Sequence, residues 1–308
     1  MSSKILIVGA TGQQGSATIQ ALLAKTPTDS PAPVQILALT RSIASKRAQS
    51  LSAAYGDKIT LVEGSPTHPD PIFQAHPDIT SVFLVTVPHT EEAQATPMID
   101  ASVAHRVQHI VFSSVDRGGD EKSWGYETPV AHFAAKCRIE EYLRIACRDK
   151  TTTRWTILRP TGFMDNYAPG TSFGMLMWTL WATMPQDRKM QLISTRDIGV
   201  FAARVLREGP DVWAGKAIGL ASDSLSFGEA EAVFKRVVGQ EPPRMWSYIG
   251  SGLRWAVGEA SASMKWFEDV GFAADLEKVR AIEPSLYDFE SWLRIKHASG
   301  GGEAAETD

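Results

Sequence analysis

The chain begins with an apolar run that ends in a glycine-patterned turn. Residues 4–9 read KILIVG, residues 9–15 read GATGQQG, and a stretch with helical spacing of apolar residues follows. A continuous apolar run is typical of a strand buried on both faces, as in a parallel sheet. Such a strand, a glycine turn and a helix, in this order, open a βαβ unit that cradles a dinucleotide. No other feature of the sequence limits the fold as much.

The three glycines of this turn have different tasks in a dinucleotide cradle. Gly9 permits the tight turn, Gly12 lets the backbone approach a pyrophosphate, and Gly15 lets the helix pack close to the sheet. The start of the helix offers free N–H groups and the positive end of its dipole to the phosphates. A turn that binds nothing is the weaker alternative, because the glycines stand directly between strand and helix. The residues expected to bind the dinucleotide here are Gly9, Ala10, Thr11, Gly12, Gln13, Gln14 and Gly15.

Strand and helix patterns alternate after this turn. Further apolar runs predict strands near residues 34–41, 58–64, 81–87, 109–115 and 154–160, and helical spacing separates the later ones around 91–106 and 129–148. This alternation predicts a parallel sheet with crossovers on both faces. The expected fold class is therefore α/β, a Rossmann-type doubly wound parallel sheet with a smaller, mainly helical C-terminal part.

The alternation stops after the sixth predicted strand. We expect residues 1–160 to form the nucleotide-binding core, and residues 161–298 to form a smaller substrate-covering part with strands and a helix that returns to the core. Residues 299–308, SGGGEAAETD, have no apolar content to bury and are predicted to be disordered. Residues 26–33, TPTDSPAP, predict a surface loop.

Composition and charge exclude several classes of function. The formal net charge is −4 and no stretch is dense in Lys or Arg, so nucleic acid is disfavoured as a ligand. The apolar-looking run at 173–184 is too short to span a bilayer, and the N-terminus shows no signal peptide. Cys137 and Cys147 lie too far apart on one predicted helix for a disulfide, and no cluster has metal-ligand spacing. We expect a cytoplasmic protein without a metal, membrane or nucleic-acid partner.

The end of the second predicted strand distinguishes between the two dinucleotides. An NAD site usually has an acidic side chain there for the ribose 2′-OH. This chain instead has Arg41 after the strand, and Lys46 in the helix that follows. A guanidinium can pair with a 2′-phosphate, whereas a carboxylate repels it. These residues favour NADP(H); the alternative is that Arg41 is a solvated loop residue.

Six segments that together span nearly the whole chain carry a resemblance to a known family: GATGQQG, the LTR strand end, AHFAAKCRIEEYL, ILRPTGFMDNY, ISTRDIGVFAARVL and PSLYDFESWL. With these segments the chain resembles the NmrA-like family, atypical members of the short-chain dehydrogenase/reductase superfamily. The resemblance implies a Rossmann-type domain that binds NADP(H) and a smaller C-terminal part that covers it. It also implies two behaviours, because relatives include NADP(H)-dependent reductases and cofactor-sensing regulators.

The resemblance draws attention to the helix at 129–148, where conventional superfamily members carry Tyr-x-x-x-Lys. The tyrosine donates a proton to the substrate and the lysine holds the nicotinamide ribose. This chain has Lys136 in the lysine place and His132 in the tyrosine place. A neutral histidine cannot donate as a phenol does, although an imidazolium can. The expected catalytic residues are Lys136, with His132 or Tyr126 as proton donors; a packed or solvent-facing His132 is an equal alternative.

Other cofactor contacts are expected at strand ends, which line the ligand crevice of an open α/β sheet. The serines that end the fifth strand, Ser113 and Ser114, bind substrate or complete a turn. Relatives have Gly-Asp after the third strand, and this chain departs from them with Gly64-Ser65. The full expected set at these strand ends is Gly64, Ser65, Thr86, Val87, Pro88, Thr161, Gly162, Phe163 and Met164.

A Met- and Trp-rich stretch, GMLMWTLWATMP at 174–185, has two interpretations. Such residues form a core, or they line a pocket for a bulky apolar ligand. The leading function is an NADP(H)-dependent oxidoreductase that acts on an apolar organic carbonyl, imine or activated alkene, in a specialised biosynthetic pathway by analogy. The alternative is a non-catalytic NADP(H)-sensing redox regulator that binds a partner protein.

Overall fold

The computed structural model describes residues 3–24, 34–148, 152–245 and 258–298. The predicted loop at 26–33 and the predicted tail at 299–308 lie outside these residues. The chain divides into two compact units: the first unit comprises 1–115, 132–159 and 196–218, and the second comprises 116–131, 160–195 and 219–308. The chain thus passes between the units several times, whereas the sequence predicted one boundary at residue 160 and, after it, a helix that returns to the core.

The first unit is built on a seven-stranded sheet with the strand order β3-β2-β1-β4-β5-β6-β9. Every pairing from β3 across to β6 is parallel. The order reverses between β1 and β4, which creates the switch point where open α/β sheets bind ligands. The strands are β1 (Ser3–Ile7), β2 (Val34–Thr40), β3 (Ile59–Glu63), β4 (Ser81–Leu84), β5 (His109–Ser113), β6 (Arg154–Pro160) and β9 (Lys216–Leu220).

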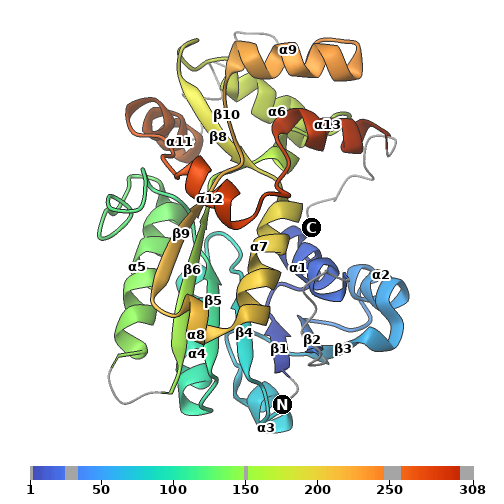
Figure 1. The fold of residues 1–308 in the computed structure, drawn as a ribbon, viewed down its shortest axis with the longest axis vertical. Coiled ribbons are helices and arrows are strands. Elements are labelled where there is room, and N and C mark those ends of the chain that lie inside the picture. The colour runs from blue at the N-terminus through green and yellow to red at the C-terminus, as the bar shows by residue number, and fades with distance from the viewer. Residues whose placement is uncertain (1–2, 25–33, 149–151, 246–257, 299–308) are drawn as a thin grey trace. The chain divides into compact units, whose positions relative to one another are not determined.

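Helices cover this sheet, as Figure 1 shows. They are α1 (Gln13–Leu23), α2 (Lys46–Tyr55), α3 (Asp70–Ala75), α4 (Glu91–Ala104), α5 (Ala131–Ala146), α7 (Thr195–Glu208) and α8 (Pro210–Trp213). An ion pair of 2.6 Å between Arg138 and Glu92 joins α5 to α4. Helix α7 packs closely on α1, because a Cβ at Gly199 would lie 2.5 Å from the carbonyl carbon of Ala17. These features confirm the predicted doubly wound α/β fold.

Most of the buried side chains of this sheet are apolar. Leu6 on β1, Val82 on β4 and Ile110 on β5 are completely buried, and they share one core cluster with Ile99 of α4 and Leu143 of α5. A parallel sheet with both faces covered needs such continuous apolar strands. This burial fixes where each strand ends, and so where the loops of the switch point begin.

The second unit has a three-stranded sheet with the order β10-β8-β7. Its elements are β7 (Gly162–Phe163), the 3-10 helix η2 (Met164–Tyr167), α6 (Ser172–Trp181), β8 (Lys189–Ile193), β10 (Asp223–Ser226), α9 (Phe227–Val238), α11 (Gly258–Asp269), α12 (Leu276–Ile282) and α13 (Phe289–Ala298). This unit is mainly helical, as the sequence predicted.

The Met- and Trp-rich stretch forms the core of the second unit. Trp178, Trp181 and Met184 are 0%, 1% and 3% exposed. The two indole rings stack with centroids 5.6 Å apart, and Tyr167 packs against both. The core interpretation therefore holds for the tryptophans, whereas Met175 and Met177 are half-buried.

The helices and the cysteines of the described residues bear on membrane spans and on disulfide bonds. None of their helices has the length and apolar character that a membrane span requires. Cys137 lies in α5 and Cys147 directly follows the end of that helix, and both are free thiols.

Candidate functional site

The turn at residues 9–15, which we call the glycine loop, has the geometry of a phosphate cradle. Gly9 has a φ of +77°, a left-handed conformation that side chains disfavour. A Cβ at Gly15 would lie 2.2 Å from the carbonyl oxygen of Gly9, so only glycine lets α1 start this close to the turn. Helix α1 begins after Gly12 with no side-chain cap and no acidic residue in its first turn. Its first N–H groups and dipole are therefore available to an anion.

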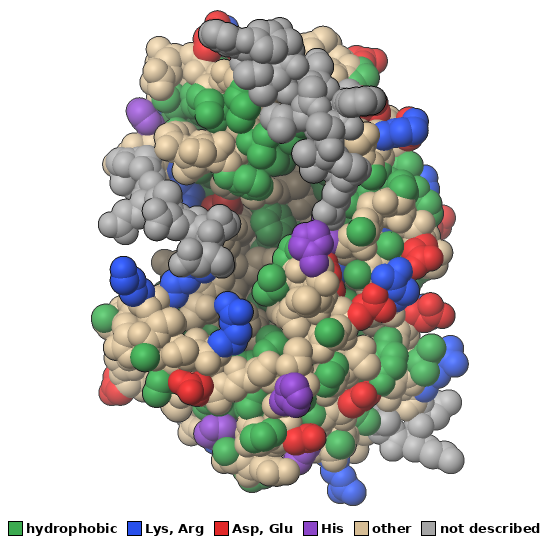
Figure 2. All heavy atoms as spheres, turned by 180° about the vertical axis from the view of Figure 1, so that it is seen from behind, with side chains coloured by type: hydrophobic (Ala, Val, Ile, Leu, Met, Phe, Trp, Pro, Cys, Tyr) green, Lys and Arg blue, Asp and Glu red, His purple; other side chains and the backbone are tan. Residues whose placement is uncertain are grey.

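Basic side chains lie where β2 leads into α2. Arg41, Lys46 and Arg47 are exposed, and Figure 2 shows Lys and Arg side chains gathered on the face that carries α2. Within the described ranges, neither Arg41 nor Lys46 has a hydrogen-bond or ion-pair partner. The Glu63 carboxylate accepts a hydrogen bond from the Ile43 N–H at 2.8 Å, which holds the connecting loop. This bond holds the loop between β2 and α2, and the side chains of Arg41, Lys46 and Arg47 remain exposed.

The loop after β4 is held rigidly by one glutamine. The Gln94 side chain bonds both the N–H and the carbonyl oxygen of Val87, at 3.3 and 3.4 Å, and donates to Thr90 at 2.6 Å. Val87 consequently exposes 62% of its surface although it is apolar. Thr86 is buried, and its hydroxyl has no hydrogen-bond partner among the described residues. An exposed apolar side chain beside an unbonded hydroxyl is what a bound ligand would cover; exposed Pro88 follows them.

Lys136 of α5 reaches the end of β5. Its ammonium donates to the carbonyl oxygen of Ser113 at 2.7 Å and lies 5.3 Å from the centre of the Phe112 ring. The Ser113 hydroxyl donates to Oε1 of Gln14 at 2.5 Å. The structure therefore brings together the glycine loop, the end of β5 and Lys136. His132, one turn earlier on α5, is half-buried. Its ring and that of Phe133 pack edge to face, with their centroids 4.5 Å apart.

A buried charged network lies beside this arrangement. Arg159 of β6 and Glu140 of α5 form an ion pair of 2.7 Å, with side chains 0% and 2% exposed. Ser114 donates to the same carboxylate at 2.5 Å. Sequence reasoning assigned no role to Glu140 or to its pairing with Arg159. The available signal was Arg159 in the otherwise apolar end of RWTILRP; α5 carries several other charged residues, so no local pattern singled out Glu140.

Gly64 and Ser65 have local structural roles. A Cβ at Gly64 would lie 2.9 Å from Cδ1 of Ile72, so the missing side chain lets α3 pack on the end of β3. The Ser65 hydroxyl is bonded to that of Thr67 at 2.7 Å. Their expected contact with the cofactor stays a prediction.

The remaining predicted site residues belong to the second unit. Tyr126 is half-buried, and the Lys122 ammonium lies 5.0 Å from the centre of its ring. The Thr161 hydroxyl donates to the carbonyl oxygen of Leu220 at 3.1 Å. Gly162 and Phe163 form the short strand β7. Met164 is 0% exposed and packs in the aromatic core, and its expected contact with the cofactor stays a prediction.

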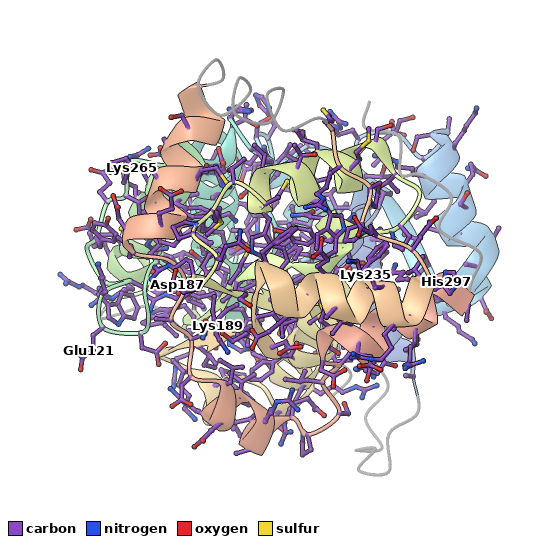
Figure 3. The ribbon with its side chains drawn as sticks, turned by 90° about the horizontal axis from the view of Figure 1, so that it is seen from above. Glu121, Asp187, Lys189, Lys235, Lys265 and His297 are labelled. Atoms are coloured by element: carbon purple, nitrogen blue, oxygen red, sulfur yellow. The ribbon has the colours of Figure 1, made fainter. Side chains whose placement is uncertain are left out.

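The second unit also has open hollows at its surface. One, of about 710 Å³, is lined largely by polar and charged residues that include Asp187, Arg188 and Lys189. Figure 3 shows Asp187 and Lys189 near one another, and Lys189 is the first residue of β8. Another, of about 650 Å³, lies at the glycine pair Gly118–Gly119. No Met or Trp of the stretch at 174–185 lines either hollow, and only its last residue, Pro185, lines the larger one, so these two hollows are not the apolar pocket that the sequence suggested.

Comparisons with known proteins agree with this geometry. Residues 1–249 match the model of the NmrA-like family. The oxidoreductase lnbB of Aspergillus flavus, described as containing an NmrA-like family domain, is 24% identical over 96% of this chain and 98% of its own. Two solved structures share the fold. NmrA, a negative transcriptional regulator in complex with NADP, has a TM-score of 0.70 at 18% identity and covers 97% and 98% of the two chains. The Escherichia coli quinone oxidoreductase QOR2 with NADPH has a TM-score of 0.72 at 19% identity and covers 96% and 100%.

Proposed function

The chain belongs to the NmrA-like family, and on that premise we propose that it is an NADP(H)-dependent oxidoreductase. Its substrate would be an apolar organic carbonyl, imine or activated alkene, and it would act in the cytoplasm, in a specialised biosynthetic pathway. The observation that carries this proposal is the convergence of Gln14, Ser113 and Lys136 beside the glycine loop. A curated relative described as an oxidoreductase supports the reaction class.

The residues of the first unit fit NADP(H). The glycine loop and the start of α1 would bind the pyrophosphate, because they offer N–H groups without a competing acidic side chain. Arg41 and Lys46 would pair with the 2′-phosphate. The unbonded Thr86 hydroxyl and exposed Val87 would lie under the bound cofactor. Solved relatives of this fold hold NADP or NADPH, which supports the same assignment.

The protein's own part in the reaction is to orient the cofactor and the substrate and to supply a proton. The bound cofactor supplies a hydride to an electrophilic carbon of the substrate. Lys136 would hold the nicotinamide ribose, and the oxygen, nitrogen or carbon that gains negative charge would take a proton from His132, Tyr126 or Lys136. The substrate is thereby reduced by two electrons.

A regulator that senses NADP(H) and binds a partner protein is the second candidate. Two observations favour it: His132 stands where conventional relatives have tyrosine, and the regulator NmrA shares the fold. A sensor needs different affinities for oxidised and reduced cofactor, or for two conformations of the protein. An enzyme needs turnover.

Calorimetric titration with NADPH, NADP⁺, NADH and NAD⁺ tests the cofactor first. We expect NADPH to bind tightly to the native chain and much more weakly to Arg41→Ala. The control is Lys58→Ala, which lies just before β3, at the opposite end of the strands from Arg41. This variant should bind NADPH as the native chain does. NADPH oxidation is then measured with quinones, enones and imines, with His132→Gln and Tyr126→Phe to identify the donor. Binding without any turnover would favour the regulator. If no dinucleotide binds, both candidates are wrong.

A further inference from the structure

The buried network beside Lys136 has a geometry that burial of apolar surface does not explain. Arg159 binds Glu140 in a forked arrangement, with Nε 3.1 Å from Oε1 and Nη2 2.7 Å from Oε2. Ser114 donates its hydroxyl to Oε1 at 2.5 Å. One guanidinium and one hydroxyl thus fix the position of one carboxylate within the first unit.

Stability alone is a poor reason for such a network. Removing two charges from water costs several kcal/mol per ion, and apolar residues of similar volume often hold a core as well or better. A forked pair adds directional precision that apolar contacts lack. The network therefore suits a task in which position matters.

The network lies one helical turn from Lys136. Glu140 follows Lys136 by four residues on α5, which is about 6 Å along the helix axis and on the same face. Ser114 directly follows Ser113, whose carbonyl oxygen accepts the hydrogen bond from Lys136. The carboxylate of Glu140 therefore ties α5 to the same strand end on which the Lys136 ammonium rests.

We propose that Glu140, Arg159 and Ser114 are positioning residues that set the place of the Lys136 ammonium over the end of β5. They touch neither cofactor nor substrate and act through Lys136. The consequence for cofactor affinity rests on the proposed function, in which Lys136 holds the nicotinamide ribose. The place of Lys136 itself does not depend on that function and can be measured without a cofactor.

Ser114→Ala is the variant of choice, because it removes one hydroxyl and leaves the ion pair intact. Ser114→Thr keeps a hydroxyl and is the rescue variant. Thr156→Val is the matched control: it removes a buried hydroxyl from β6, where Thr156 is bonded to His109 of β5 at 2.7 Å, away from Lys136. Thermal unfolding of all three variants shows that each one folds.

The first measurement is the acylation rate of Lys136 by an N-hydroxysuccinimide ester, followed by mass spectrometry on the cofactor-free protein. We expect Ser114→Ala to change the rate for Lys136 about 3-fold or more and to leave exposed Lys58 unchanged, since loss of one hydrogen bond of about 1 kcal/mol is about 5-fold. Ser114→Thr and Thr156→Val should behave as the native chain does. An unchanged rate in Ser114→Ala would overturn the proposal.

The second measurement is a double-mutant cycle on the dissociation constant of NADPH. Ser114→Ala should weaken binding about 5-fold in the native background and have no effect in Lys136→Ala, because the network acts through that residue. An equal effect in both backgrounds would show a merely structural role and contradict the proposal. If the native chain bound no NADPH, the proposed function would fail, whereas the acylation rates would still decide on the network.

Discussion

The ammonium of Lys136 donates a hydrogen bond to the main-chain carbonyl oxygen of Ser113 at 2.7 Å. The bond joins the middle of α5 to the end of β5, the strand next to the switch-point strand β4. It holds a positive charge where the loops of the sheet meet. The same serine's hydroxyl is bonded to Gln14 of α1, so the lysine and the glycine loop are connected by a single residue.

Replacing Lys136 should weaken cofactor binding selectively. Hydrogen bonds to a charged group contribute about 1.5–3 kcal/mol, so Lys136→Ala should raise the dissociation constant of NADPH roughly 10- to 100-fold. Arg138→Ala, two residues further on the same helix and on its exposed face, is the control. Isothermal titration at constant ionic strength measures both. Equal effects of the two variants would contradict a specific role for Lys136.

Reversing the charge at residue 41 should reverse the preference between dinucleotides. Arg41→Asp places a carboxylate where the 2′-phosphate is expected to lie and offers an acceptor to a ribose 2′-OH. We expect NADPH affinity to fall by about 100-fold, as when a charge-assisted bond is replaced by repulsion, and NADH affinity to rise. Lys58→Asp makes the same change in charge elsewhere on the first unit. Loss of affinity for both dinucleotides alike would argue against a 2′-phosphate contact.

Adding one methyl group to the glycine loop should destabilise the first unit. In Gly15→Ala the new Cβ would lie 2.2 Å from the Gly9 carbonyl oxygen, a backbone atom that cannot move without shifting α1. We expect a loss of about 2 kcal/mol or more in the free energy of unfolding, together with loss of dinucleotide binding. The control is Gly228→Ala in α9, where a Cβ meets no atom within 4 Å. Thermal denaturation should show no loss for that variant.

The buried His109 should make stability depend on pH. Burial disfavours the imidazolium and lowers the pKa of His109 from 6.5 to about 4. Between pH 6.5 and pH 4, His109 therefore binds a proton in the unfolded chain but not in the folded chain. This contribution to stability is complete above pH 6.5, and it is lost as pH falls towards 4, by at most about 3 kcal/mol.

Chemical denaturation of the native chain and of His109→Gln, from pH 7.5 to 4, measures this loss. The glutamine amide can still form a hydrogen bond with Thr156, so the pH dependence should shrink while the fold persists. His68→Gln, at an exposed histidine, should retain the native pH dependence. A native-like pH profile for His109→Gln would show that other groups cause the loss.

What the sequence could predict was local. Strand β1, the glycine loop and α1 follow one another directly, so about twenty residues of sequence were enough to predict them. The alternation of apolar runs with helical stretches then predicted the parallel sheet. The bond between Ser113 and Gln14 joins residues 99 positions apart, and no local pattern encodes it. The sequence did not predict the pairing of Glu140 with Arg159, for the same reason.

Burial was the second quantity that local patterns left open. Trp178 and Trp181 have the same spacing whether they line a pocket or fill a core, and only packing against Tyr167 and its neighbours decides between the two. Likewise, the sequence did not show that the missing side chain of Gly64 makes room for Ile72; the expected cofactor contact of Gly64 stays a prediction. The sequence suggested that a helix after residue 160 returns to the core, but it did not show that the chain re-enters the first unit from residue 196 to residue 218.

That late return has a consequence for the order in which the protein is made. Helix α7 and strand β9 come from residues 195–220, yet α7 packs on α1 and β9 pairs with β6 in the first unit. A nascent chain of 160 residues would leave β6 as an open edge and the contact surface of α1 bare, and both features promote misassociation. The nucleotide-binding half is therefore finished only after most of the second unit's N-terminal segments have left the ribosome, and a fragment cut at residue 160 lacks part of its own core.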